Sequence, residues 1–180
     1  MNLETRLSEK SSAILDRWLQ LTLETYPADT QRFLKKQKDP FANPIRDTIS
    51  REINNIYKAL IQGVDRERVS PCLDRIIRIR AVQDFSPSQA ISFVLLLKKV
   101  IREVLVKEIR EGRLFDELLI IESRIDDLSL LAFDIYMKRR EKLYEIKANQ
   151  AKNQVSKLLE RAGLICEIPQ WQPDLKEDNG

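Results

Sequence analysis

The sequence contains no histidine in its 180 residues. Histidine is the commonest general base, the commonest transition-metal ligand and the usual proximal haem ligand. Its absence excludes serine–histidine and cysteine–histidine hydrolases, zinc enzymes with histidine ligands and His-ligated haem proteins. We therefore expect a protein that is not an enzyme and that needs no cofactor and no metal.

Cysteine and glycine are also scarce. The two cysteines, Cys72 and Cys166, form no CxxC pair, so we expect two thiols in a reducing cytosol and not a disulfide. The four glycines stand too far apart to build a phosphate-binding loop.

Targeting and membrane signals are missing as well. The N-terminus lacks the apolar core of a signal peptide, and the longest apolar run, residues 93–97, is far shorter than the ~20 residues that span a bilayer. A net charge of +3 gives no reason to expect nucleic-acid binding. We expect a cytoplasmic protein without membrane insertion.

Helical patterns account for most of the chain. In the clearest case Asn43 is suited to be the N-cap, Pro44 the first helical residue and Gly63 the left-handed cap of a helix over 44–62. Apolar spacing predicts further helices over 3–25, 29–36, 70–82 (with Ser70 as N-cap before Pro71), 87–111 and 114–162. The fold class is therefore all-α, a bundle of about six helices with a long protruding C-terminal helix.

The end of the last helix has a pattern of its own. After a polar stretch, apolar residues return at Ala151, Val155, Leu158, Ala162 and Ile165, which is the spacing of a coiled-coil seam. We expect Val155, Leu158, Leu159 and Ala162 to bind a second copy or a partner helix. The predicted organisation is a helical domain over 1–145, a helical extension over 146–168 and a flexible tail over 169–180.

Two polar segments interrupt the helices. In the loop 38–44, two prolines fix the backbone, and we expect Phe41 to be buried as its anchor between Asp39 and Asn43. In the segment 78–90, Ser86, Pro87 and Gln89 match a capping box, and Phe85 is placed to pack onto Ala90 as a hydrophobic staple.

The capping box leaves the first half of that segment unexplained, apart from an i, i+4 pair between Arg80 and Asp84. A helix junction, a small-ligand or anion pocket and an interaction surface remain open. The candidate residues are Arg78, Arg80, Gln83, Asp84, Ser86, Ser88 and Gln89.

Two charged clusters have simpler interpretations. The arginines between Arg66 and Arg80 alternate with carboxylates, which predicts ion pairs on a solvated face. Glu122, Asp126 and Asp127 lie close together on one helix, but di-iron bundles pair carboxylates with histidine, so we do not expect a metal there.

The segments 39–44 and 78–90, together with Trp18 and residues 93–98, resemble the RsbRD-type N-terminal domain of RsbT co-antagonist proteins, over about residues 10–140. This resemblance implies a globin-like signalling input domain that binds no haem, dimerises and passes a signal through its C-terminal helix. The output in related proteins is a STAS domain of the stress-response stressosome or a histidine kinase.

The chain ends at Gly180, which leaves no room for such an output domain. We therefore expect a stand-alone dimeric sensor or adaptor that acts on a separate protein partner. Two alternatives stay open. One is a small-molecule or anion-binding protein with its pocket at 78–90, and the other is a small redox accessory protein.

Overall fold

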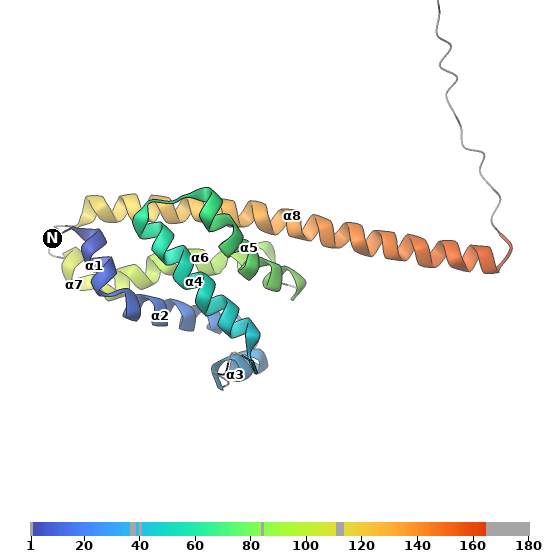
Figure 1. Ribbon diagram of the computed structural model, residues 1–180, viewed down its shortest axis with the longest axis horizontal. Helices are drawn as coiled ribbons and strands as arrows, with labels where there is room; N and C mark the ends of the chain where they lie inside the picture. Colours follow the sequence, from blue (N-terminus) through green and yellow to red (C-terminus); the bar gives the residue numbers. More distant parts are fainter. Residues whose placement is uncertain (1, 37–38, 40, 84, 111–113, 165–180) are drawn as a thin grey trace, which may run out of the picture. The chain divides into compact units, whose positions relative to one another are not determined.

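The computed structural model describes residues 2–36, 39, 41–83, 85–110 and 114–164. Within these ranges the regular structure consists of helices and contains no strand (Figure 1), which confirms the all-α prediction and is consistent with a globin-like domain. The described helices are α1 (Leu3–Glu9), α2 (Ser11–Glu24), α3 (Ala28–Lys36), α4 (Pro44–Gln62), α5 (Arg66–Val82), α6 (Pro87–Val104), α7 (Val106–Arg110) and α8 (Phe115–Arg161).

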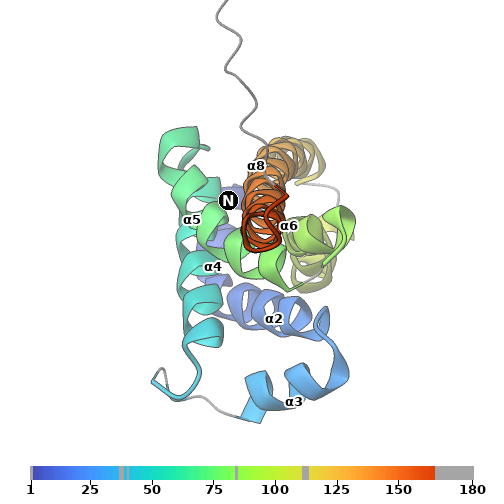
Figure 2. The ribbon, with the colours of Figure 1, turned by 90° about the vertical axis from the view of Figure 1, so that its right-hand side faces the viewer.

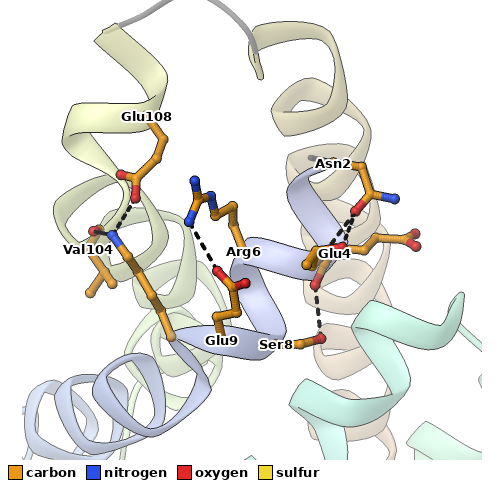
Figure 3. A network of polar contacts seen from close by, with 9 residues as sticks. Asn2, Glu4, Arg6, Ser8, Glu9, Val104 and Glu108 are labelled. Carbon is orange, nitrogen blue, oxygen red and sulfur yellow. Dashed lines mark hydrogen bonds and ion pairs between the residues drawn. The ribbon is translucent and has the colours of Figure 1, made fainter.

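The structure describes more helices than the six predicted, because two of the predicted helices are each divided into two. The first breaks at Lys10, between α1 and α2, and the helix that follows Pro87 breaks at Leu105, between α6 and α7. The two breaks lie next to each other in space. The Lys10 ammonium at the first break donates to the Val104 carbonyl at 3.2 Å and to the Glu108 carboxylate at 2.5 Å, on either side of the second break (Figure 3). A carbonyl at a helix end lacks an intrahelical partner, and the Lys10 side chain supplies one.

The predicted start of α5 is wrong. The helix begins at Arg66, where the Asp65 side chain accepts the Glu67 N–H at 3.0 Å, and Pro71 lies inside the helix. The additional turn buries Val69 in the core. Pro71 is the sixth residue of the helix and has no N–H to donate to the Glu67 carbonyl, so α5 lacks that one i−4 bond. Burial of Val69 thus outweighs the preference of proline for the first helical position.

The predicted N-cap of α4 is present, and the helix ends at Gly63 as predicted, with a positive φ but a ψ of 121° that differs from a left-handed α cap. The Asn43 side chain accepts the Arg46 N–H at 3.1 Å, and Gly63 has a φ of 93°. The helix lies beside α5, while α2 lies against α6 (Figure 2). Between these pairs lies the core, in which the Trp18 indole donates to the Phe93 carbonyl at 2.6 Å and the Tyr57 hydroxyl donates to the Leu7 carbonyl at 2.9 Å.

Phe41 is not the buried anchor of the loop before α4, because its side chain is 96% exposed. The buried residue is Asn43, whose side-chain amide donates to the Leu34 carbonyl at 3.3 Å while its oxygen caps α4. An asparagine satisfies the end of α3 and the start of α4 at once, which an aromatic ring cannot do. Asp39 supports the loop by accepting the Phe41 N–H at 3.1 Å.

The chain divides into two structural units, Met1–Glu141 and Lys142–Gly180. The first holds α1 to α7 and the part of α8 up to Glu141. In the second, the side chains of residues 142–164 are exposed, except for half-buried Leu143 and Ser156. The predicted tail over 169–180 and Cys166 lie outside the described residues, whereas Cys72 is a free thiol. Among the helices that the structure describes, none combines the length and the hydropathy that crossing a membrane requires.

Candidate functional site

Arg80 is fully buried at the junction between α5 and α6. One terminal nitrogen of its guanidinium, Nη1, donates to the Gln89 carbonyl at 3.0 Å. The other, Nη2, donates to the Thr22 carbonyl at 3.2 Å and to the Thr25 hydroxyl at 2.8 Å. A single side chain from the last turn of α5 therefore joins the end of α2 to the first turn of α6.

Three aromatic rings enclose the same guanidinium. Its central carbon lies 5.1 Å from the ring centroid of Tyr26, 5.0 Å from that of Phe85 and 5.2 Å from that of Phe93. These distances are within the range of cation–π attraction. Burial lowers the pKa of Arg80 below its ordinary value and raises that of the Tyr26 hydroxyl. Among the residues that the structure describes, no carboxylate forms an ion pair with Arg80.

The Arg80 site also contains buried polar atoms that lack a hydrogen-bond partner within the described part of the chain. They are Nε of Arg80 and the hydroxyl groups of Thr22 and Tyr26. An unpaired buried polar atom costs free energy, so such atoms mark places where a water molecule or a ligand is favoured.

The remaining residues of the 78–90 segment lie around this buried arginine. The predicted capping box is present: the Ser86 hydroxyl accepts the Gln89 N–H at 3.3 Å, and the Gln89 side chain accepts the Ser86 N–H at 3.0 Å. Arg78, Gln83, Ser86, Ser88 and Gln89 are exposed, and Asp84 lies outside the described residues. The segment thus combines a buried anchor with an exposed polar rim.

Helix α8 contacts the backbone on both sides of this junction. The Tyr136 hydroxyl donates to the Phe85 carbonyl at 2.6 Å, and the Arg140 guanidinium donates to the Ala81 carbonyl at 3.1 Å. Arg139 forms an ion pair with Asp74 on α5. A displacement of α5 relative to α6 would therefore act directly on α8.

The acidic residues of α8 form ion pairs with α6. Arg102 binds Glu122 through two hydrogen bonds of 2.6 and 2.7 Å, and Lys98 binds Asp126 at 2.6 Å. No cluster of three or more metal-ligating side chains occurs in the described ranges. In the arginine-rich segment, Arg75 makes the predicted kind of ion pair, with Glu52 at 3.0 Å, whereas buried Arg80 departs from that prediction.

A second surface of α8 carries large apolar side chains that face solvent. Its residues, which we call the α8 stripe, are Phe115, Leu119, Leu130, Phe133 and Met137. Their spacing of four, eleven, three and four places them on one side of the helix. The core side of α8 is different and carries Leu118, Ile121, Ile125 and Leu128. The sequence analysis predicted the helix but did not identify the stripe, although the spacing of its apolar residues is a signal for it.

One end of the stripe borders a groove of about 410 Å³ between α6–α7 and α8. Val106 and Ile109 line one wall of the groove, and Phe115 and Leu119 line the other. The predicted contact residues in the second unit, Val155, Leu158, Leu159 and Ala162, are also exposed.

Comparison with known proteins gives one match. No curated protein and no solved structure matches the chain. A family model described as the RsbT co-antagonist protein rsbRD N-terminal domain matches residues 12–151. That match spans the Arg80 junction and most of α8 and covers more than half of the sequence, so the chain belongs to the family of rsbRD-type N-terminal domains, the regulatory domains of RsbT co-antagonist proteins.

Proposed function

We propose that this domain is a non-catalytic sensor or adaptor that works as a homodimer, without a STAS or kinase domain in the same 180 residues, and transmits its signal to a separate protein in the cytoplasm. The observation that carries this proposal is the α8 stripe. Single apolar residues on a surface are ordinary, but a row of large ones on one helix face marks an interaction surface. In the second unit, Val155, Leu158, Leu159 and Ala162 are exposed as well and offer a further contact surface.

The input side of the domain is the Arg80 junction. Its exposed rim, which includes Arg78, Gln83 and Ser88, offers polar groups to a ligand or a partner. Binding there would shift α5 relative to α6 and so change the hydrogen bonds that Tyr136 and Arg140 make to the junction backbone. Helix α8 would pass the shift on, because a helix transmits displacement as a rigid element.

A second candidate function is the binding of a small molecule or an anion at the same junction. It is favoured by the unpaired buried atoms of Arg80, Thr22 and Tyr26, which a polar ligand would satisfy. Native mass spectrometry of the purified protein tests this second function. A small molecule that stays bound to the native protein and is released on denaturation supports it.

The dimer is tested by sedimentation velocity of the 180-residue protein over a range of concentrations. We expect a dimer and a shift toward monomer in Leu130→Asp, which places a charge on the α8 stripe. Phe33→Asp is the matched control, because Phe33 is 54% exposed on α3 and lies away from the stripe. A wild-type protein that stays monomeric at every concentration would contradict the proposal.

A further inference from the structure

A groove between α2 and α4 shares no residue with the Arg80 junction or with the α8 stripe. It holds about 410 Å³, and its apolar lining consists of Leu15, Leu19 and Ile53. The rest of its lining is polar and comes from both helices. A hollow of this size with apolar side chains and a few convergent polar groups is the usual form of a small-molecule site. We call it the α2–α4 groove.

Four polar side chains of the α2–α4 groove are not used by the fold. They are Ser12 and Asp16 of α2 and Ser50 and Asn54 of α4. Within the part of the chain that the structure describes, none of these four side chains forms a hydrogen bond or an ion pair. Each has an oxygen atom that can accept a hydrogen bond. The groove therefore presents a set of acceptors that a bound molecule can satisfy.

The charges in the α2–α4 groove favour a cation over an anion. The basic residue of the lining, Arg51, already binds Asp47 at 3.3 Å and Glu52 at 3.1 Å. The Asp16 carboxylate, by contrast, has no cation within ion-pair distance among the described residues. An anion would have to displace two carboxylates from Arg51, whereas a cation finds Asp16 unpaired.

We infer that the α2–α4 groove binds a small molecule that carries a protonated amino group on an apolar chain. An alkylammonium group has three N–H donors and no acceptor. Asp16 accepts one of these donors in a charge-assisted hydrogen bond, which is the stronger kind, and the hydroxyl and amide oxygens of the groove accept the others. The alkyl chain covers the half-buried Leu15 and Leu19, which removes apolar surface from water.

This site goes beyond the proposed function, because it depends neither on a dimer nor on the rim of the Arg80 junction. The groove and the junction are nevertheless connected through α2. Leu19 lies about one helical turn before Thr22, whose carbonyl accepts a hydrogen bond from Arg80 at 3.2 Å. An amine in the groove therefore contacts the same helix that Arg80 holds at its end, which makes the groove a second input site of the domain.

Titration of the 180-residue protein with butylamine, followed in amide NMR spectra, tests the site. Near neutral pH this probe is a monovalent cation on a short alkyl chain. We expect saturable shifts of the amide signals of Asp16, Ser50 and Asn54. Butyrate and 1-butanol have the same number of carbon atoms but carry a negative charge or none, and they should give no saturable shift of these signals. Equal responses to the three probes, or no saturable response of these amides to butylamine, would overturn the inference.

The charge of Asp16 is tested by a variant of equal size. Asp16→Asn removes the charge, so the dissociation constant for butylamine should rise about tenfold. Asp29→Asn is the matched control, because it makes the same change at an exposed carboxylate on α3, outside the groove. It should leave the constant within about twofold of the wild-type value. Equal constants in the two variants would contradict the role of Asp16.

Ser50→Phe separates binding in the groove from a general attraction of cations to Asp16. Ser50 is exposed in the groove, so the new ring occupies this space and leaves every charge in place. We expect the response to butylamine to disappear, and a dissociation constant within about twofold of the wild-type value would overturn the inference. Sedimentation velocity of the same samples reports the dimer, so failure of this site and failure of the proposed function are seen separately.

Discussion

Arg80 donates a hydrogen bond to the carbonyl oxygen of Gln89 at 3.0 Å, from the last turn of α5 to the first turn of α6. The guanidinium is fully buried, and burying a charge is costly unless hydrogen bonds satisfy it. Here backbone carbonyls and a hydroxyl group accept its hydrogens and aromatic rings cover its faces. Arg80 therefore fixes how three helix ends meet.

Arg80→Met should lower the free energy of unfolding by about 3 kcal/mol, because it removes the buried hydrogen bonds from the guanidinium to the Thr22 and Gln89 carbonyls and to the Thr25 hydroxyl. Urea denaturation followed by circular dichroism measures the loss. Arg78→Met is the matched control on the same helix. Since Arg78 is exposed, we expect a change within about 0.5 kcal/mol. Equal losses in the two variants would show that Arg80 does not organise the junction.

Tyr136→Phe should weaken the link between α8 and the junction. The change removes the hydroxyl that donates to the Phe85 carbonyl, and we expect a loss of about 1 kcal/mol. Amide hydrogen exchange in residues 81–90 should become faster, because α8 no longer holds that backbone.

Tyr57→Phe is the control for this effect. It removes a similar buried hydrogen bond, to the Leu7 carbonyl, at a position away from the junction. We expect a comparable loss of stability without faster exchange in 81–90. If both variants speed exchange in 81–90 equally, the effect is general destabilisation, and α8 has no special link to the junction.

The features that sequence reasoning predicted correctly are the local ones. The capping box at Ser86 and the N-cap of α4 depend on residues within a few positions of each other, so their pattern is visible in the sequence. The partners of Arg80 were not predictable in this way. Thr22 and Thr25 lie 58 and 55 positions away, and no local pattern links them to an arginine in α5.

The wrong predictions share a physical cause. Proline at the first helical position and a phenylalanine anchor are preferences of isolated segments. In the folded chain, α5 begins at Arg66, before Pro71, because this buries Val69. In the loop before α4, Asn43 is buried in place of Phe41, because its side chain forms hydrogen bonds there. Tertiary packing overrides the local preferences at these two positions, and tertiary contacts cannot be read from a local sequence pattern.

Glu52 should make stability depend on pH in the acid range. Burial alone would raise the pKa of its carboxyl group, but hydrogen bonds from Asn55, Arg51 and Arg75 outweigh this and hold the pKa below its ordinary value of 4.5. The folded protein therefore keeps Glu52 charged where the unfolded chain binds a proton. The stabilisation is fully present well above pH 4.5 and is lost as the pH falls below it.

Glu52→Gln should remove this dependence. The difference in unfolding free energy between wild type and variant should be largest near pH 6 and should shrink toward pH 3, as measured by urea denaturation at each pH. Glu4→Gln, at an exposed carboxylate, is the control and should show a small difference at every pH. A gap between wild type and Glu52→Gln that widens on acidification would contradict the assignment.

Substitutions of Asn43 and Phe41, two residues of the same loop, should differ in their effect on the free energy of unfolding. Asn43→Ala should cost about 1–2 kcal/mol, since it removes the cap of α4 and leaves the Leu34 carbonyl without its donor. Phe41→Ala should change the free energy of unfolding by no more than about 0.5 kcal/mol, because its ring is 96% exposed. Thermal and urea unfolding of both variants compare them directly. A larger loss in Phe41→Ala than in Asn43→Ala would mean that the aromatic ring is the anchor after all. The expected order leaves Phe41 as an exposed aromatic group that the fold itself does not need, and such a group is available to a binding partner.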